Sequence, residues 1–325
     1  MDLLVNIEFG NNPKLFYVML KFKLKDGKEL SMATERDNIK MLGRVEELNR
    51  LLEDKEFKIV ASNNFKNNGS KVGYALTSKV GNAAPVVYYD DIAPFWESNQ
   101  DIIEFLENVF QKYKIGYVNL EKCCTREYIV SHVKPRLVSS DNLKMVQEHG
   151  IVYEEFLDML ILYYFEIEEM SDDEGMASAT LKYGMLEQAG ITLQELKEYA
   201  DTNLKEDYRI ESLEYIISRA LGEDWNGEDI EDEMPMWVVT NRKGMQGAAT
   251  ILSKEILTEV SKNFDSGTFA IIPSSVHECI VVSAGKIDEE VLRRMVYEVN
   301  RTELQADDIL TDSVYLYKNG KVTIY

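Results

Sequence analysis

From Met236 to Tyr325 the chain alternates between strand-like and helix-like segments, and this regularity limits the folds open to it more than any other property. β-Branched and aromatic residues mark the strands, and apolar residues repeated every three or four positions mark the helices. The pattern predicts a βαββαββ order whose first six elements match the split βαβ, ferredoxin-like arrangement. The predicted strands are 236–240, 269–272, 277–282, 314–317 and 321–325, and the predicted helices are 247–260 and 288–299.

Local signals place the ends and the inner faces of these elements. Asn319-Gly320 is a strong two-residue hairpin signal between the last two strands. The first helix should turn Leu252, Ile256 and Val260 inward, and the second should turn Leu292, Met295, Val296 and Val299 inward.

The rest of the chain mixes strands with amphipathic helices, so we expect an α+β protein with mixed sheets. One helix should bury a face formed by Ile39, Leu42, Val45, Leu48 and Leu52. Capping signals at Ser98 with Asp101 and at Thr192 with Glu195 should begin two more helices. The helix after Thr192 should turn Leu193, Leu196, Tyr199, Ala200 and Leu204 inward. The expected strands are 3–9, 15–24, 71–77, 85–89, 156–167 and 177–183.

A length of 325 residues suits two or three domains of roughly 100–150 residues. We expect N-terminal strands plus a helix over residues 1–56 and a central α+β domain over 57–221. An acidic linker over 222–233 should lead to a C-terminal α+β domain over 234–325, because this stretch holds two glycines and many acids without an apolar period.

The net charge of -21 repels phosphate backbones and anionic lipids, so general nucleic-acid binding and membrane binding are not expected. The longest apolar run, 156–165, contains Asp158 and is too short to cross a bilayer. Three cysteines and an acidic start, Met1-Asp2, indicate a reduced compartment without a secretory signal. We therefore expect a cytoplasmic protein.

One stretch could carry nucleophilic chemistry. His277 could act as a base for Ser274, Ser275 or Cys279, because such pairs need a nucleophile within hydrogen-bond reach of a base. The plainer interpretation is that the serines cap a turn after Pro273 and that His277 is a hydrogen-bonded strand-end residue.

A second stretch could bind an anion. Asn241, Arg242, Lys243, Gly244 and Gly247 lie in a loop between a predicted strand and a predicted helix, and helix N-termini attract phosphate. The spacing matches no known phosphate loop, so a tight turn followed by close helix packing is the plainer interpretation.

No cofactor and no metal site is predicted, because the three histidines and three cysteines lack ligand spacing. Asp158, inside an apolar run, would have a raised pKa if buried, although such acids more often face solvent or cap a neighbouring element.

Five groups of segments carry a further resemblance: 66–69, 199–203, 236–241 with 247–249, 272–278, and 295–300 with 312–315. Together they resemble a family of unknown function found in anaerobic, often gut-dwelling, bacteria. The resemblance covers roughly residues 57–325, and it implies a cytoplasmic bacterial protein and no reaction. Cys279 stands where the family pattern suggests an aliphatic residue, which argues against an essential thiol.

These observations favour a non-enzymatic protein that binds another protein, such as a basic one, through an acidic surface. The hydrolase and the anion or nucleotide sensor stay open as alternatives. An acidic decoy that occupies a nucleic-acid-binding site on another protein is a third alternative, because charge of this sign permits it.

Overall fold

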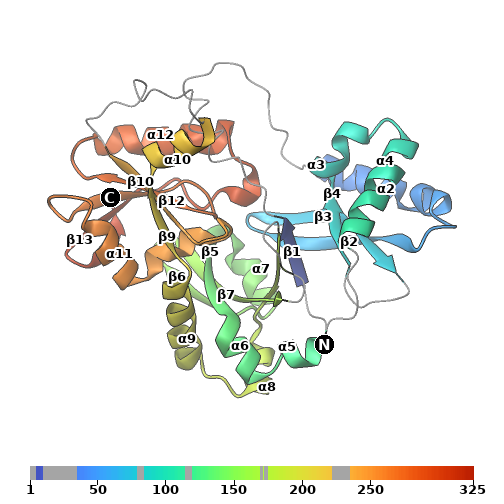
Figure 1. The fold of residues 1–325 in the computed structure, drawn as a ribbon, viewed down its shortest axis with the longest axis horizontal. Helices are drawn as coiled ribbons and strands as arrows, with labels where there is room; N and C mark the ends of the chain where they lie inside the picture. The colour runs from blue at the N-terminus through green and yellow to red at the C-terminus, as the bar shows by residue number, and fades with distance from the viewer. Residues whose placement is uncertain are drawn as a thin grey trace.

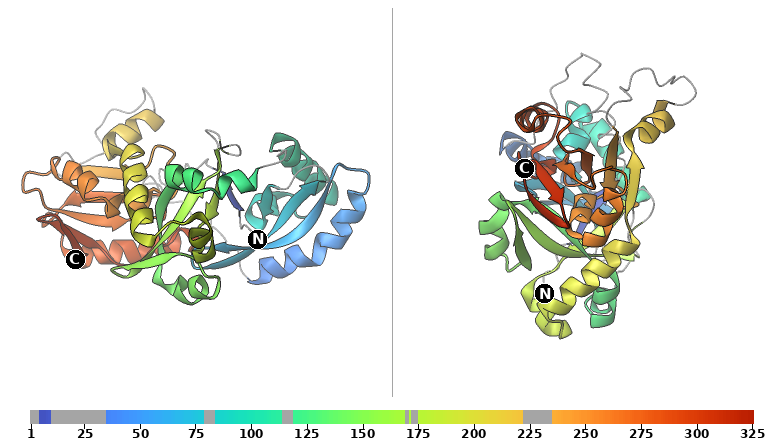
Figure 2. Two further views of the ribbon diagram at one scale, coloured as in Figure 1. Left: turned by 90° about the horizontal axis from the view of Figure 1, so that it is seen from below. Right: turned by 90° about the vertical axis from the view of Figure 1, so that its left-hand side faces the viewer.

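The computed structural model describes residues 5–9, 35–78, 84–113, 119–168, 171, 175–221 and 235–325. The expected strand 15–24 and the expected acidic linker 222–233 lie outside these residues. Three sheets and the helices that cover them confirm an α+β fold. Figures 1 and 2 show a smaller lobe, formed by residues 35–78 and 84–113, beside a larger body that holds the other two sheets.

The smaller lobe is a three-stranded antiparallel sheet, in the order β2-β3-β4, packed against helices. Ser98 caps α4 by accepting from the Asp101 amide, as the capping signal predicts, and Ile102, Leu106 and Phe110 face the core. The elements are α2 (Glu35–Leu51), β2 (Phe57–Lys66), β3 (Gly69–Ser78), β4 (Val86–Tyr88), α3 (Tyr89–Ile92), a 3-10 turn (Ala93–Phe95) and α4 (Asn99–Lys112).

The inner face of α2 differs from the prediction. Leu48 and Leu52 are buried as expected, but Ile39 and Leu42 are 63% and 54% exposed, and Met41 is buried instead. The face that meets β2 and β3 therefore runs through Met41, a residue outside the apolar spacing of the prediction. The helix shares this core with Phe57 and Ile59 of β2, so the expected boundary at residue 57 falls inside one packed cluster.

The middle sheet has β7 at its centre. β5 pairs with β7 from Val133 to Ser139, while β6 and β8 pair with the first and last parts of its other edge, and β1 extends the sheet beyond β8. Most of the apolar run 156–167 is thus the strand β7, as predicted, but Phe156 ends β6 and a turn at Leu157 and Asp158 separates it from Met159. The elements are β1 (Val5–Phe9), α5 (Leu120–Cys123), α6 (Arg126–His132), β5 (Val133–Ser139), a 3-10 turn (Ser140–Asn142), α7 (Leu143–Glu148), β6 (Tyr153–Phe156), β7 (Met159–Glu166), β8 (Gly175–Thr180), α8 (Tyr183–Ala189) and α9 (Leu193–Glu206).

Helix α9 begins with the predicted capping box between Thr192 and Glu195. Leu196, Ala200 and Leu204 are buried, but Tyr199 is 39% exposed, so its predicted inward orientation is wrong.

The C-terminal sheet has six antiparallel strands in the order β14-β13-β11-β12-β10-β9. The predicted order of strands and helices is confirmed, and Asn319 and Gly320 adopt positive φ in the last turn as a hairpin of this type requires. The elements are β9 (Arg209–Ser212), α10 (Leu213–Leu221), β10 (Met236–Thr240), a 3-10 helix (Gly247–Leu252), α11 (Lys254–Ser261), β11 (Phe269–Pro273), β12 (Cys279–Ser283), α12 (Glu289–Thr302), a 3-10 turn (Ala306–Asp308), β13 (Tyr315–Lys318) and β14 (Lys321–Ile324).

The strand order departs from the ferredoxin-like arrangement. β12 lies between β10 and β11, which is the split βαβ unit, but β13 pairs with β11 and β9 takes the place beside β10. Two further predictions need correction. Met295 of α12, expected inside, is 38% exposed. The single helix expected over 247–260 is a 3-10 helix followed by α11.

The middle and C-terminal sheets share a core, in which Leu137 and Met159 pack with Val239, Ile271 and other C-terminal residues. Asp158 joins the same two parts, because its carboxylate accepts hydrogen bonds from Thr311 Oγ1 at 2.6 Å and from the Tyr315 hydroxyl. Burial acts to raise the pKa of the Asp158 carboxyl, but these hydrogen bonds outweigh it and the pKa is lowered. Asp158 therefore lies against hydroxyl donors of the C-terminal part rather than alone in an apolar core.

Candidate functional site

The loop between β11 and β12 holds the residues proposed for nucleophilic chemistry. β12 begins at Cys279, so His277 lies in the loop and not on a strand. The hydroxyls of Ser274 and Ser275 donate to Glu278 Oε1 at 3.0 and 2.7 Å. Burial raises the pKa of the Glu278 carboxyl, against the opposing effects of His277 and the two serines.

The His277 ring contacts two other segments. Its Nε2 lies 3.3 Å from Asp308 Oδ1, and its Nδ1 accepts from the Gln246 amide at 3.3 Å. Cys279 is buried, its Sγ lies 3.7 Å from the Ala248 carbonyl, and burial raises the pKa of its thiol, which disfavours the thiolate. We interpret this network as one that holds three segments together: the loop between β11 and β12, the stretch around Gln246 and Ala248, and the turn that contains Asp308.

The loop 241–247 is closed by its own side chains. Asn241 donates to the Met245 carbonyl and accepts from the Met245 amide, and Met245 packs against Tyr164 and Met176 of the middle sheet. Lys243 forms an ion pair with Glu166, and the Arg242 amide donates to Asp207 at 3.2 Å.

The two glycines of this loop have different roles. Gly244 has a φ of 66°, which glycine adopts readily. A Cβ at Gly247 would lie 2.2 Å from Thr240 Oγ1 and 2.6 Å from the His277 carbonyl, so close packing of the backbone requires this glycine. The geometry matches the tight-turn interpretation of the loop.

The tip of the β2–β3 hairpin reaches the larger body. Asn67 Oδ1 accepts from the Ser139 amide at 2.8 Å and from Asn142 Nδ2 at 2.9 Å, and its Nδ2 donates to the Asp307 and Ile309 carbonyls at 3.2 and 2.6 Å. Lys71, further along β3, forms ion pairs with Asp90 at 3.3 Å and Asp307 at 3.0 Å. These contacts fix the hairpin against both other parts of the protein.

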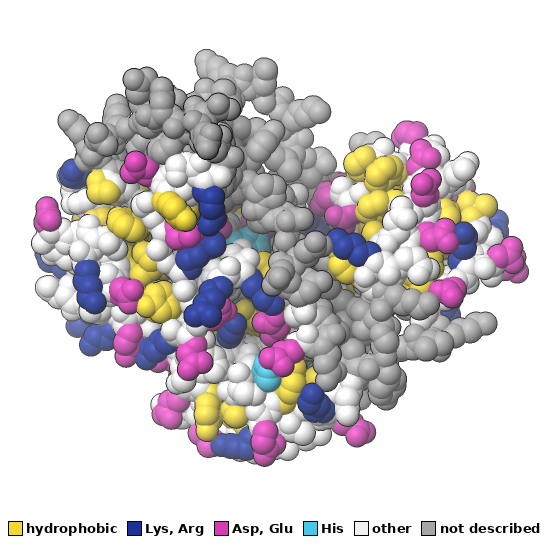
Figure 3. Space-filling view, viewed as in Figure 1, with side chains coloured by type: hydrophobic (Ala, Val, Ile, Leu, Met, Phe, Trp, Pro, Cys, Tyr) yellow, Lys and Arg dark blue, Asp and Glu magenta, His cyan; other side chains and the backbone are white. Residues whose placement is uncertain are grey.

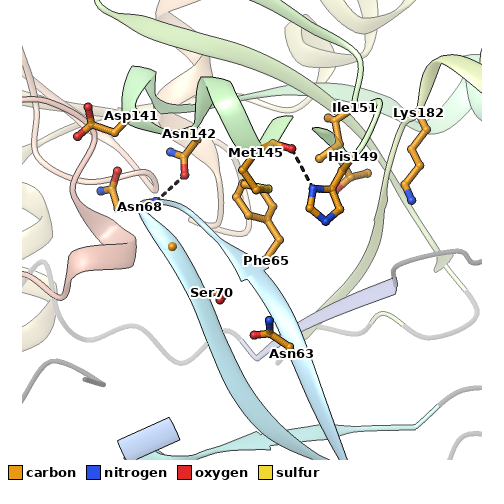
Figure 4. Close-up of a pocket in the computed structure, with 12 residues that line it drawn as sticks. Asn63, Phe65, Asn68, Ser70, Asp141, Asn142, Met145, His149, Ile151 and Lys182 are labelled. Atoms are coloured by element: carbon orange, nitrogen blue, oxygen red, sulfur yellow. Dashed lines mark hydrogen bonds between the residues drawn. The ribbon is translucent and has the colours of Figure 1, made fainter. Parts of the chain in front are cut away.

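A cavity of about 420 Å³ lies beside this hairpin tip, between the hairpin and the middle sheet (Figure 4). Phe65 of β2, Met145 of α7 and the buried Ile151 form its apolar walls. Polar groups come from Asn63, Asn68 and Ser70 on the hairpin and from Asn142, Thr180 and Lys182 on the body.

His149 and Lys182 lie on the same side of the cavity and point in the same direction in Figure 4. His149 Nδ1 lies 2.9 Å from the Met145 carbonyl. A carbonyl can only accept, so Nδ1 carries the proton of this hydrogen bond. Asp141 lies at the opposite end, beside Asn68 (Figure 4).

This cavity was not predicted from the sequence. Its lining comes from five separate parts of the chain between Asn63 and Lys182, and no spacing within one part marks it. The Asn-rich and Gly-containing stretch 63–69 indicates a turn, but it does not indicate that this turn docks on the middle sheet.

The described residues place further limits on function. Across these ranges no three His, Cys, Asp or Glu side chains gather as a metal site would require. In the same part of the chain, every helix is too short or too polar to traverse a bilayer. On the face shown in Figure 3, Lys and Arg side chains are interspersed with Asp and Glu side chains.

The fold and the cavity define an α+β protein with a ligand-sized cavity between two lobes. The chain belongs to the family of unknown function DUF5688, whose family model matches residues 43–319. The match confirms the family resemblance and begins within α2, before the expected residue 57. No curated protein and no solved structure matches the chain.

Proposed function

We propose that this protein is a non-enzymatic binding protein that holds a small molecule in the cavity between the β2–β3 hairpin and the middle sheet. The observation that most directly supports this proposal is the cavity itself, which has a volume of about 420 Å³. Small-molecule sites typically measure about 300–1,000 Å³, occur at the junctions of folded units, and combine apolar walls with a few polar groups.

The position of the hairpin supports a preformed site. Asn68 donates its backbone amide to Asn142 Oδ1 at 2.9 Å and its side-chain amide to the Ala306 carbonyl at 2.7 Å. Asn68 comes from the hairpin wall and Asn142 from the wall formed by the body, so the bond between them joins the two walls at one end of the cavity. Binding to a preformed cavity avoids much of the ordering cost of a mobile one.

A neutral fluorescent probe tests the proposal. N-Phenyl-1-naphthylamine, which brightens in apolar surroundings, should bind the full chain saturably with one probe per protein. Ser70→Trp places a large side chain at an exposed strand position that lines the cavity, and it should abolish probe binding. Val60→Trp, at another exposed position of the same hairpin but not among the lining residues, should bind like the parent.

The proposal fails if the probe does not bind, or if both tryptophan variants bind it equally. Circular dichroism of each variant shows that the fold is retained, so that loss of binding reports the cavity.

The net charge of -21 supports a second proposal, that of a cytoplasmic protein with a basic protein partner. A partner held by charge should be captured at low salt and released as salt screens the attraction. Capture that is unchanged between 50 mM and about 500 mM salt would count against a charge-driven partner.

A further inference from the structure

One end of the cavity carries two donors side by side. Thr180 is the last residue of β8, and Lys182 follows two residues later, so alternation along an extended segment directs both side chains to the same side. Both line the cavity. Lys182 is bridged to Ile151 through the backbone, which fixes its position against the body.

A buried guanidinium stands behind Thr180. Arg136 of β5 is 5% exposed, and its Nη2 donates to Thr180 Oγ1 at 2.6 Å. Arginine has no acceptor, so the threonine oxygen must accept, and the threonine proton is left to donate to another group. A hydroxyl polarised by a cation in this way is a good donor to an anion.

The charge at this end is positive. Among the described residues, no ion pair joins Lys182 to a carboxylate. Asp141, the acid that lines the cavity, lies at its other end (Figure 4). In a chain of net charge -21, an anion would enter only where such a local cationic group offsets the general repulsion.

We propose that the ligand is an organic anion, with its carboxylate, sulfonate or phosphate group between Thr180 and Lys182. Its apolar body packs against Phe65, Met145 and Ile151. This inference rests on the proposed function and adds the chemical class of the ligand. It differs from the anion site expected at residues 241–247, whose Lys243 is paired with Glu166.

A matched pair of probes tests the charge separately from the cavity. 8-Anilinonaphthalene-1-sulfonate has the same two aromatic groups as N-phenyl-1-naphthylamine and adds one sulfonate. Lys182→Met removes the ammonium and keeps the length of the side chain. Lys262→Met makes the same change of charge at an exposed position that does not line the cavity.

We expect Lys182→Met to weaken binding of the sulfonate probe by about tenfold, as for loss of one charge-assisted hydrogen bond, and to change binding of the neutral probe by less than about twofold. Lys262→Met should change neither. Equal weakening of both probes by Lys182→Met would overturn the anion inference, because Lys182 would then be only a wall. An unchanged sulfonate affinity in that variant would overturn it as well.

The two proposals fail in different ways. If the neutral probe binds and Ser70→Trp blocks it, while the sulfonate shows no dependence on Lys182, the cavity is a ligand site of another class. If neither probe binds, the cavity is not a ligand site and both proposals are refuted.

Discussion

Replacing Asn67 with alanine tests whether the hairpin tip holds the two lobes together. The side chain makes four hydrogen bonds, to the Ser139 amide, Asn142 Nδ2 and the Asp307 and Ile309 carbonyls. The Ile309 carbonyl keeps a second donor, Asn68 Nδ2, and Asn142 Nδ2 keeps a second acceptor, the Ser139 carbonyl, so two groups lose their partner. At about 1 kcal/mol for each net hydrogen bond, Asn67→Ala should lower the free energy of unfolding by about 2 kcal/mol.

Urea denaturation followed by circular dichroism measures this loss. Hydrogen exchange gives a local readout, because the Ser139 amide loses its acceptor and should exchange faster in the variant. Asn263→Ala is the matched control, since within the described part of the chain the Asn263 side chain donates only to the nearby Val260 carbonyl, at 3.2 Å.

Asn67→Asp separates the two halves of the network. An aspartate keeps an acceptor for Ser139 and Asn142 but turns an oxygen towards the Asp307 and Ile309 carbonyls, so it should also destabilise. The reasoning would be refuted if Asn67→Ala cost less than about 1 kcal/mol, or if Ser139 exchanged at its parental rate.

Three further substitutions have defined outcomes. Gly247→Ala should lower the free energy of unfolding by about 3 kcal/mol, since its Cβ would meet Thr240 Oγ1 and backbone atoms, and an unchanged urea midpoint would contradict this. Hydrogen bonds from Thr192 and Arg126 lower the pKa of Glu195 to about 2 from its ordinary 4.5. Glu195→Gln should therefore be less stable than the parent at pH 7, and the difference should shrink as pH falls from 4.5 towards 2 in pH-dependent thermal unfolding. For Glu278 the pH dependence of stability should have the opposite sign, because burial raises the pKa of its carboxyl above 4.5. The parent should therefore lose stability relative to Glu278→Gln as pH rises from 4.5. A parallel pH dependence of the two proteins would disprove this.

Much of the secondary structure follows from local patterns. The strand Met236–Thr240 and the capped helices after Ser98 and Thr192 match the predictions, because alternation and capping act within a few residues. The inner faces were less predictable. Ile39 and Leu42 of α2 are exposed although their spacing is apolar, since the neighbouring sheet and not the helix decides which face it covers.

The candidate residues in the two loops were found by residue type, but their partners were not. His277 meets Asp308 and Gln246, and Lys243 meets Glu166, all of them far away in the sequence. Side-chain type indicates which bonds a group can form, whereas only the packed chain determines which group is within reach.

The amino-acid sequence by itself determined the α+β class, the order of elements after Met236 and the family, because these depend on periodicity and local motifs. Tertiary structure alone decided the strand order of the C-terminal sheet, the docking of the hairpin tip through Asn67, and the cavity with Lys182 at one end. Each of these joins residues from distant parts of the chain, and such contacts form only when burial of the shared cores brings those parts together.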